Sequence, residues 1–153
     1  MTKVKHFTDS LYYELILTTK YMRMLGAQVF EQECIEATPD EFSTLDVISC
    51  NSDICQRDLA KLILKDRANT GRLLDSLEEK GFITRSLVER NNRPIKQINI
   101  TPKGEEFLES TTTILREHLE TVNGCISEEK IHETCEFLKN FREIASKIIK
   151  STI

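Results

Sequence analysis

Apolar residues recur at intervals of three and four along three long stretches of the chain, which is the spacing of a helix with one buried face. The first stretch, Leu11 to Phe30, predicts a long N-terminal helix. A second helical pattern opens with Thr101 and Pro102, an N-cap and first-turn pair, and continues to Gly124. A last helix is apolar at Ile131, Cys135, Phe137, Leu138, Phe141, Ile144, Ala145, Ile148 and Ile149. This is more apolar surface than a lone terminal helix would carry.

Three shorter helices are predicted between the long ones. Thr38 and Glu41 form a capping-box pattern at the start of the first. Asp53 and Gln56 form a similar pair at the start of the second, which has an apolar stripe of Ile54, Leu59, Leu62 and Ile63. The third is apolar at Leu73, Leu74 and Leu77. It ends at Gly81, where a left-handed C-terminal residue is needed.

The period of the pattern then changes from that of a helix to that of a strand. The segment FITRSLVERNNRPIKQINIT alternates apolar and polar residues on either side of ERNNRP. Asn91 and Asn92 tolerate the positive φ angles of a hairpin tip. The sequence therefore predicts a two-stranded hairpin after the third short helix.

The order of these elements indicates a mainly α-helical fold with a small β-hairpin wing. Short helices joined by a tight turn and followed by a hairpin form a winged helix-turn-helix, here flanked by long helices. With 153 residues and no repeat or low-complexity linker, residues 1–153 are expected to form a single domain. The winged helix-turn-helix lobe is expected at residues 38–103.

Charge is distributed unevenly along the chain. The net charge is -4, yet residues 52–103 contain 11 Lys and Arg against 7 Asp and Glu, while the remainder contains 10 against 18. A basic centre in an acidic protein favours a nucleic-acid partner, because Lys and Arg release counterions from phosphates.

The segment KDRANTGR concentrates hydrogen-bond donors at the front of the third short helix. In a winged helix-turn-helix this helix enters the major groove of double-stranded DNA with its first turns against the base edges. A forked guanidinium can bind guanine or phosphate, an asparagine can pair with adenine, and a threonine can meet a thymine methyl. The predicted DNA-binding residues are Lys65, Arg67, Asn69, Thr70 and Arg72. The alternative is that this segment is only a solvated helix face.

The hairpin adds a second basic surface. An exposed wing with arginines at its tip has a place in the adjacent minor groove or on phosphate. The predicted contact residues of the wing are Arg90, Asn92, Arg93 and Lys96.

Two segments, QRDLAKLILKDRANTGRLLDSLEEKGFITRS and NNRPIKQINITPKGEEFL, resemble the MarR family of multiple antibiotic resistance regulators. The pieces DLA, LLDSLEEKGFI and ITPKG follow the family's order and are close to its spacing. The resemblance implies a homodimer whose dimerisation region comprises residues 8–31 and 102–150. It also implies a DNA-binding repressor that acts on a pseudo-palindromic operator and is released by a small-molecule effector. A cytoplasmic location is expected because the segment LYYELILTTKYMRM after the N-terminus is too polar and too short for a signal or membrane segment.

The resemblance also bears on individual residues. The family's usual ligand pocket lies between the dimerisation helices and the DNA-binding lobe, so Tyr12, Tyr13 and Met22 are candidates to line such a pocket. The alternative is that they pack in the core, as aromatic and methionine residues at helical spacing normally do.

The family wing carries Asp-Arg-Arg where this chain has Asn92, Arg93 and Pro94. The acidic residue that commonly anchors the wing arginine is therefore absent.

Cysteine usage leaves a second kind of regulator open. The five cysteines show neither a C-x-x-C pair nor zinc spacing, which favours reduced and mostly buried thiols. Oxidation of Cys50 or Cys55, near the start of the lobe, is the alternative redox-sensing hypothesis. The sequence predicts no metal site.

Two further classes of protein are weighed against the DNA-binding interpretation. An enzyme is not expected, because the chain has no glycine-rich phosphate loop, nucleophile elbow or zinc-protease motif, and no cofactor is predicted. No segment is apolar enough to suggest a membrane span. A winged-helix protein-interaction module that does not bind DNA remains an alternative, because fold alone does not fix function.

Overall fold

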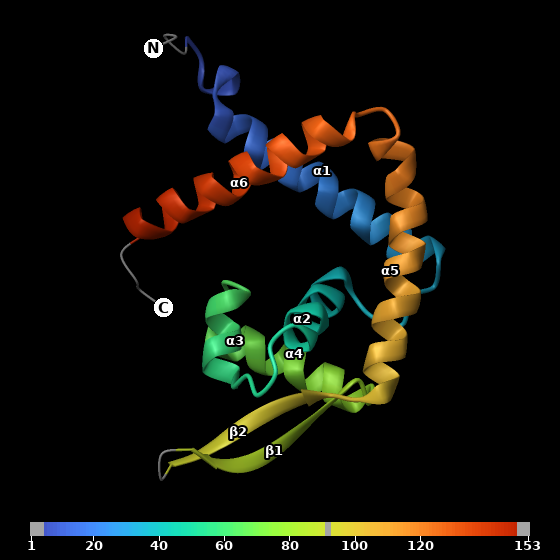
Figure 1. The fold of residues 1–153 in the computed structure, drawn as a ribbon, viewed down its shortest axis with the longest axis vertical. Coiled ribbons are helices and arrows are strands. Elements are labelled where there is room, and N and C mark those ends of the chain that lie inside the picture. Colours follow the sequence, from blue (N-terminus) through green and yellow to red (C-terminus); the bar gives the residue numbers. More distant parts are fainter. Residues whose placement is uncertain (1–4, 91–92, 150–153) are drawn as a thin grey trace. The chain divides into compact units, whose positions relative to one another are not determined.

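The computed structural model describes residues 5–90 and 93–149 (Figure 1). A short 3-10 helix, η1 (Phe7–Asp9), precedes the elements predicted from the sequence. These are α1 (Leu11–Gln32), α2 (Pro39–Ser49), α3 (Gln56–Leu62), α4 (Arg67–Glu79), β1 (Ile83–Arg90), β2 (Arg93–Ile100), α5 (Pro102–Asn123) and α6 (Glu128–Ile148). The predicted fold of long helices, short helices and one hairpin is therefore confirmed.

The chain divides into two compact units, Met1–Ser43 and Thr44–Ile153, with the boundary inside α2. The first unit contains α1, whose N-terminus is capped by Ser10 Oγ, 3.2 Å from the amide of Tyr13. Phe30 at the end of α1 is buried and meets the ring of Phe42 edge-on, with ring centroids 5.9 Å apart.

The capping box predicted at the start of α2 is present. The amide of Thr38 donates to Glu41 Oε2 at 2.6 Å, and the amide of Glu41 donates to Thr38 Oγ1 at 3.2 Å. Each side chain thus satisfies an amide that the helix itself leaves without an acceptor.

The second unit has its core where α3, α4 and the hairpin meet. Its fully buried apolar residues come from α2, α3, α4, β1, β2 and the turn before β1, and they are Leu45, Leu59, Leu74, Leu77, Phe82, Ile83 and Ile98. The hairpin is antiparallel, and its register pairs Ile83 with Ile100 at the base and Arg90 with Arg93 at the far end. Asn91 and Asn92, predicted to form its tip, lie outside the described residues.

The predicted start of α3 is wrong. Asp53 has φ 62°, and the N-cap is Cys55, which makes no side-chain capping bond. The reason is that the segment before α3 forms an isolated β-bridge to β2: Ile54 accepts a hydrogen bond from the amide of Ile98 at 3.0 Å, and Cys55 pairs with Gln97. Leu62, placed in the buried stripe, is 55% exposed.

The turn between β2 and α5 packs tightly against the turn between α4 and β1. Thr101 accepts the amide of Gly104 at 3.1 Å as a helix cap, and it donates to the carbonyl of Gly81 at 2.7 Å. Gly81 has φ +76°, the left-handed conformation predicted for the end of α4. A Cβ at Gly104 would lie 2.3 Å from the carbonyl oxygen of Phe82. Only glycine fits there without displacing the backbone.

None of the described helices combines the length with the apolar run that crossing a bilayer requires. The described side chains of α6 include no buried residue, and Phe137, Ile144 and Ile148 are exposed.

Gly104→Ala is expected to lower the free energy of unfolding by about 1–3 kcal/mol, because the new methyl group collides with backbone rather than with a flexible side chain. The measurement is urea unfolding followed by circular dichroism. Gly26→Ala in α1 is the matched control, because nothing lies within 4 Å of a Cβ there. It is expected to be neutral or stabilising, by about 0.5–1 kcal/mol. Equal effects of the two substitutions would contradict the close approach at Gly104.

Candidate nucleic-acid interface

The first turn of α4 is ordered by its N-cap, Asp66. The carboxylate accepts the amide of Asn69 at 2.8 Å and the side-chain amide of Asn69 at 2.5 Å. These bonds, that from the backbone amide first, hold the pKa of Asp66 below its ordinary value. Arg72 Nη1 lies 3.4 Å from Asn69 Oδ1. The cap therefore orients both an amide and a guanidinium on the surface of the helix.

The donors predicted from the sequence mostly lie on the surface of α4. Arg67, Asn69 and Arg72 are exposed, and Lys65, in the turn before the helix, is half-buried. Three long or branched donors thus share the first two turns of one helix, with their polar atoms open to solvent.

Thr70 differs from this set, and its predicted contact with a thymine methyl does not fit the structure. The residue is fully buried, and its hydroxyl donates to the carbonyl of Asp66 at 2.8 Å. Thr70 stands four and seven residues before Leu74 and Leu77, so it lies on the buried face of α4, and the bond to the carbonyl satisfies its hydroxyl there. That spacing was present in the sequence, and the predicted contact with DNA did not take it into account.

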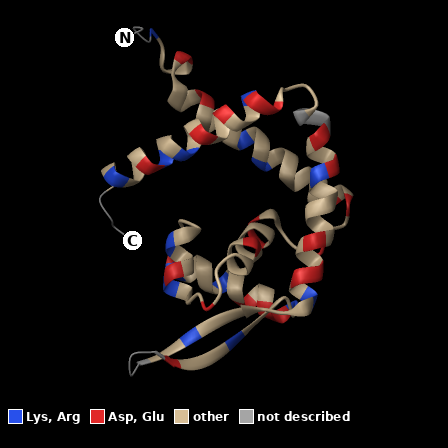
Figure 2. Cartoon of the chain, viewed as in Figure 1, with Lys and Arg blue, Asp and Glu red and all other residues tan. Residues whose placement is uncertain are grey.

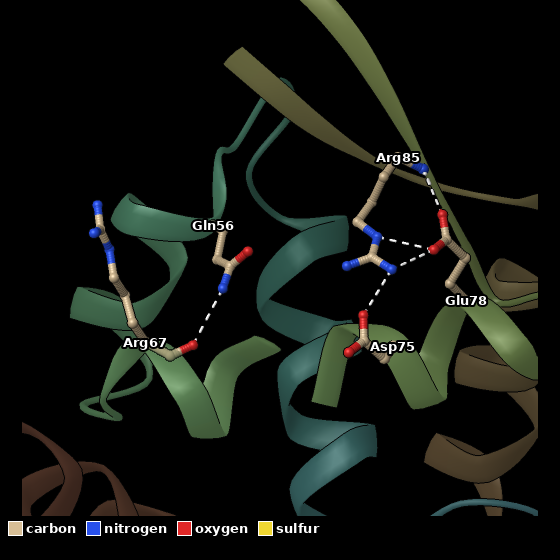
Figure 3. A network of polar contacts seen from close by, with 5 residues as sticks. All are labelled: Gln56, Arg67, Asp75, Glu78 and Arg85. Carbon is tan, nitrogen blue, oxygen red and sulfur yellow. Dashed lines mark hydrogen bonds and ion pairs between the residues drawn. The ribbon is translucent and has the colours of Figure 1, made fainter. Parts of the chain in front are cut away.

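Gln56 joins the start of α3 to the start of α4. Its Nε2 donates to the carbonyl of Arg67 at 3.1 Å, as Figure 3 shows. A Cβ at Gly71 would come within 3.3 Å of the same nitrogen. The glycine inside α4 therefore leaves room for the amide that connects the two helices.

The wing residues are described only in part. Arg90 and Arg93 form the last backbone pair of the hairpin, while their side chains and the whole of Asn92 lie outside the described residues. Lys96 is exposed and pairs in register with Leu87, which is 72% exposed. The hairpin therefore projects from the core with an exposed cation on β2.

Arg85 on β1 forms a polar network with α4 that was missed in the sequence (Figure 3). Its Nε donates to Glu78 Oε2 at 2.9 Å, its Nη2 reaches both that oxygen and Asp75 Oδ1, the latter at 2.8 Å, and its backbone amide donates to Glu78 Oε1 at 3.1 Å. The two acids are three residues apart, which places them on one face of α4. The spacing of the two acids and the arginine that follows them in the sequence were the signals that could have predicted this network.

The network shifts both partners toward their charged forms. Bonding to Arg85 holds the pKa of Glu78 below its ordinary value, against the opposing effect of burial. The pKa of Arg85 is raised, by its bond to Glu78 first. The three charges therefore hold one another in place at neutral pH.

Cys50 and Cys55 are both free thiols, and the prediction that the cysteines are mostly buried is wrong. Cys34, Cys50, Cys125 and Cys135 are exposed, and Cys55 is half-buried. Cys55 Sγ donates to Asp58 Oδ2 at 3.1 Å, and this bond is the main cause of the lowered pKa of Asp58. Cys34, Cys50 and Cys125 lie in turns and Cys55 is the N-cap of α3, so these four do not belong to the buried face of a helix, and Cys135 lies on α6, which buries none of its described residues. No group of three His, Cys, Asp or Glu within residues 5–90 and 93–149 could hold a metal ion.

The aromatic and methionine residues considered for an effector pocket lie on α1. Tyr12 is 62% and Met22 49% exposed, and Tyr13 is half-buried, with its ring 6.0 Å from that of Phe7. In the second unit, a pocket of ≈ 420 Å³ lies between α2 and α5. It is lined by Asp46, Ser49, Glu105, Leu108, Glu109, Thr112, Thr113 and Arg116. The three predicted residues are not part of it.

Two short helices joined by a tight turn, the second with open donors in its first turns, and a following hairpin define a winged helix-turn-helix protein. A model of the MarR family matches residues 37–95, which span α2, α3, α4 and β1. Residues 37–95 therefore match the family that the sequence motifs indicated.

Solved structures of MarR-type regulators share the fold over almost their whole length. A structure of the S. aureus MepR-DNA complex is 23% identical, covers 92% of this chain and 99% of its own, and has a TM-score of 0.73. The transcriptional repressor CouR bound to a 23-mer DNA duplex is 19% identical, covers 93% and 99%, and has a TM-score of 0.79. The apo form of E. coli MarR is 19% identical, covers 86% and 96%, and has a TM-score of 0.72. The chain has the fold of these transcription regulators.

The bond between Glu78 and Arg85 is expected to make stability depend on pH. Because folding lowers the pKa of Glu78 from its ordinary 4.5, the stabilisation is present above that pH and is lost as the pH falls through the lower folded value. The free energy of unfolding of the wild type should therefore exceed that of Glu78→Gln near neutral pH, and the difference should shrink in acid. Urea unfolding of both proteins from about pH 7 to about pH 3 measures it. Glu79→Gln, the same change at an exposed neighbouring acid, is the control, and an equally pH-dependent difference there would contradict the assignment.

Proposed function

We propose that this protein is a sequence-specific transcription regulator that binds double-stranded DNA as a homodimer and acts as a repressor. The observation that carries the proposal is the exposed set of Arg67, Asn69 and Arg72 on α4, with Asn69 held by the Asp66 cap. The match of residues 37–95 to the MarR family and the DNA bound in the related MepR and CouR structures support it.

Binding would place the first turns of α4 in the major groove. There the guanidinium of Arg72 can form paired hydrogen bonds with guanine, and the amide of Asn69 can pair with adenine. The hairpin would lie against the backbone or the adjacent minor groove, with Lys96 toward phosphate. The excess of cations in residues 52–103 would make affinity fall steeply with salt.

A homodimer accounts for the apolar surface of α6. Phe137, Ile144 and Ile148 are 49%, 60% and 74% exposed and recur at helical spacing along one face. Exposed apolar residues grouped in this way are typical of an interface. Two lobes in a symmetric dimer would read half-sites about one helical turn apart, which fits a pseudo-palindromic operator.

Release by a small molecule is the regulation that fits the family. The pocket is lined by residues of α2, which belongs to the predicted DNA-binding lobe, and of the long helix α5. Its lining includes the carboxylates of Asp46, Glu105 and Glu109 and the guanidinium of Arg116. A ligand held there would contact both elements at once. Tyr12, Tyr13 and Met22, exposed or half-buried on α1, remain candidates for a second ligand surface.

The experiment that tests DNA binding is a fluorescence-anisotropy titration of the purified protein against DNA from upstream of its own gene. It is run at two salt concentrations with excess nonspecific competitor. Tight, salt-sensitive binding that resists the competitor is expected. Weak binding that the competitor abolishes would contradict the proposal and favour a protein-interaction module.

Arg72→Ala is expected to weaken binding to the specific site by about 1–3 kcal/mol if the guanidinium reads a base. The same titration with single-base variants of the site measures this, because the wild type but not the variant should discriminate at the contacted position. Arg142→Ala, which removes an exposed arginine from α6, is the control and should leave base discrimination unchanged.

Ile144→Glu is expected to convert the dimer to monomer, because it puts a charge on the apolar face of α6. Size-exclusion chromatography with light scattering measures the mass of each protein. Ser146→Glu adds the same charge at an exposed polar position of the same helix and should remain dimeric. A wild-type mass of one chain, or a dimer that survives Ile144→Glu, would contradict the proposed interface.

A further inference from the structure

Two adjacent pairs of the hairpin, Arg85 with Ile98 and Ser86 with Gln97, contact the elements around its base. On one side Arg85 of β1 meets α4, and on the other its register partner, Ile98 of β2, bonds to Ile54. The next pair outward is Ser86 with Gln97, whose side-chain amide reaches Asp53. Among residues 86–89 of β1 none is buried. Beyond the pair of Ser86 and Gln97 the wing therefore extends away from these contacts.

The contacts of Arg85 are directional as well as ionic. Both oxygens of Glu78 are occupied, one by the backbone amide of Arg85 and the other by its guanidinium. Asp75 Oδ1 accepts from Nη2 at 2.8 Å. Because a forked guanidinium bound on two edges cannot rotate freely, these contacts define an angle between β1 and α4.

The length of the wing amplifies any change in that angle. From Arg85 to Arg90 the strand spans about 17 Å at its usual rise per residue, so a rotation of about 10° at the base would move the end by about 3 Å. That distance is enough to break a hydrogen bond to a phosphate or base edge.

We propose that Glu78 and Asp75 are positioning residues that hold Arg85 at the base of the hairpin and thereby direct the wing onto the DNA that α4 reads. This inference rests on the proposed function. It assigns the acidic rear of the recognition helix a role in DNA binding without any contact to DNA.

Whether Glu78→Gln strengthens or weakens DNA binding distinguishes a positioning role of Glu78 from a purely electrostatic one. Removing a carboxylate from a DNA-binding lobe should strengthen binding, because the acid repels phosphate. If Glu78 positions the wing, Glu78→Gln should instead weaken binding, because a glutamine has one acceptor oxygen and cannot hold both the backbone amide and the guanidinium of Arg85.

The test compares Glu78→Gln with Glu79→Gln, which removes the same charge one residue further along α4. Titrations against the specific site over a range of salt are expected to show Glu78→Gln binding about tenfold more weakly, with the slope of log K against log salt shallower by about 1 for each phosphate that the wing no longer reaches. Glu79→Gln should bind as tightly as the wild type or more tightly. A fraction of unfolded protein would lower the active concentration but leave the slope unchanged.

Two further variants guard against a local loss of folding. Asp75→Asn changes a side chain that is 67% exposed, and Arg85→Lys keeps the charge but removes the forked guanidinium. Both are expected to give smaller reductions in affinity, with the same shallower slope. If Glu78→Gln, Asp75→Asn and Arg85→Lys all bind as tightly as the wild type, the proposal is overturned.

Hydrogen exchange in the free protein tests the clamp without DNA. Glu78→Gln should speed exchange of the amides of Arg85 and of residues 86–89 and 95–98, while Glu79→Gln should not. Faster exchange confined to the hairpin supports the proposal, and unchanged exchange overturns it. If the wild type fails to bind DNA specifically, the proposed function fails, and the exchange result still decides whether Glu78 holds the wing.

Discussion

The burial of Phe82 joins the recognition helix, the wing and α5. Its ring is fully buried and stacks on Phe107 of α5 with ring centroids 4.4 Å apart. Its amide bonds to Leu77 of α4, and its carbonyl accepts from the amide of Thr101 at 3.0 Å. Because one residue bonds to α4 on one side and packs on α5 on the other, displacement of either helix would disturb its packing. Phe82 therefore links the end of α4, the start of β1 and the first turns of α5.

The charged residues of α4 form two groups, one at the front of the helix and one at its rear. Cations and amides at the front of the helix are open to solvent, and the cap at Asp66 orders them. Two of the acids at the rear, Asp75 and Glu78, are paired with Arg85, whose charge offsets part of their repulsion toward phosphate. A recognition helix can thus carry a net acidic rear with a smaller loss of affinity for DNA, provided that the acids have a partner.

Charge also distinguishes the lobe from the helix that follows it. Figure 2 shows acidic residues predominating along α5, beyond the more basic segment from α3 to β2. The Lys103 ammonium lies 4.9 Å above the ring of Phe82 at the point where α5 begins. The basic surface therefore ends near the core residue that joins the two regions, which would confine DNA to the lobe.

Local signals in the sequence were sufficient to predict most of the elements. The capping box at Thr38 and Glu41, the left-handed Gly81 and the Thr101 cap each depend on residues within a few positions of one another, so they can be recognised without knowledge of the fold. The exposed donors of α4 were found from their concentration in KDRANTGR, directly before the apolar Leu73, Leu74 and Leu77.

Contacts between elements were decided by the tertiary structure. Nothing near Asp53 indicates that the chain before α3 pairs with β2, because the partner is more than forty residues away. The inward position of Thr70, the amide bridge from Gln56 and the clamp on Arg85 likewise depend on which face of each element meets another. The sequence alone therefore determined where most of the helices and strands begin, α3 excepted, and which residues can donate or accept. Only packing decided which of those groups face the core, each other or solvent, because that depends on distances between segments that the local pattern does not contain.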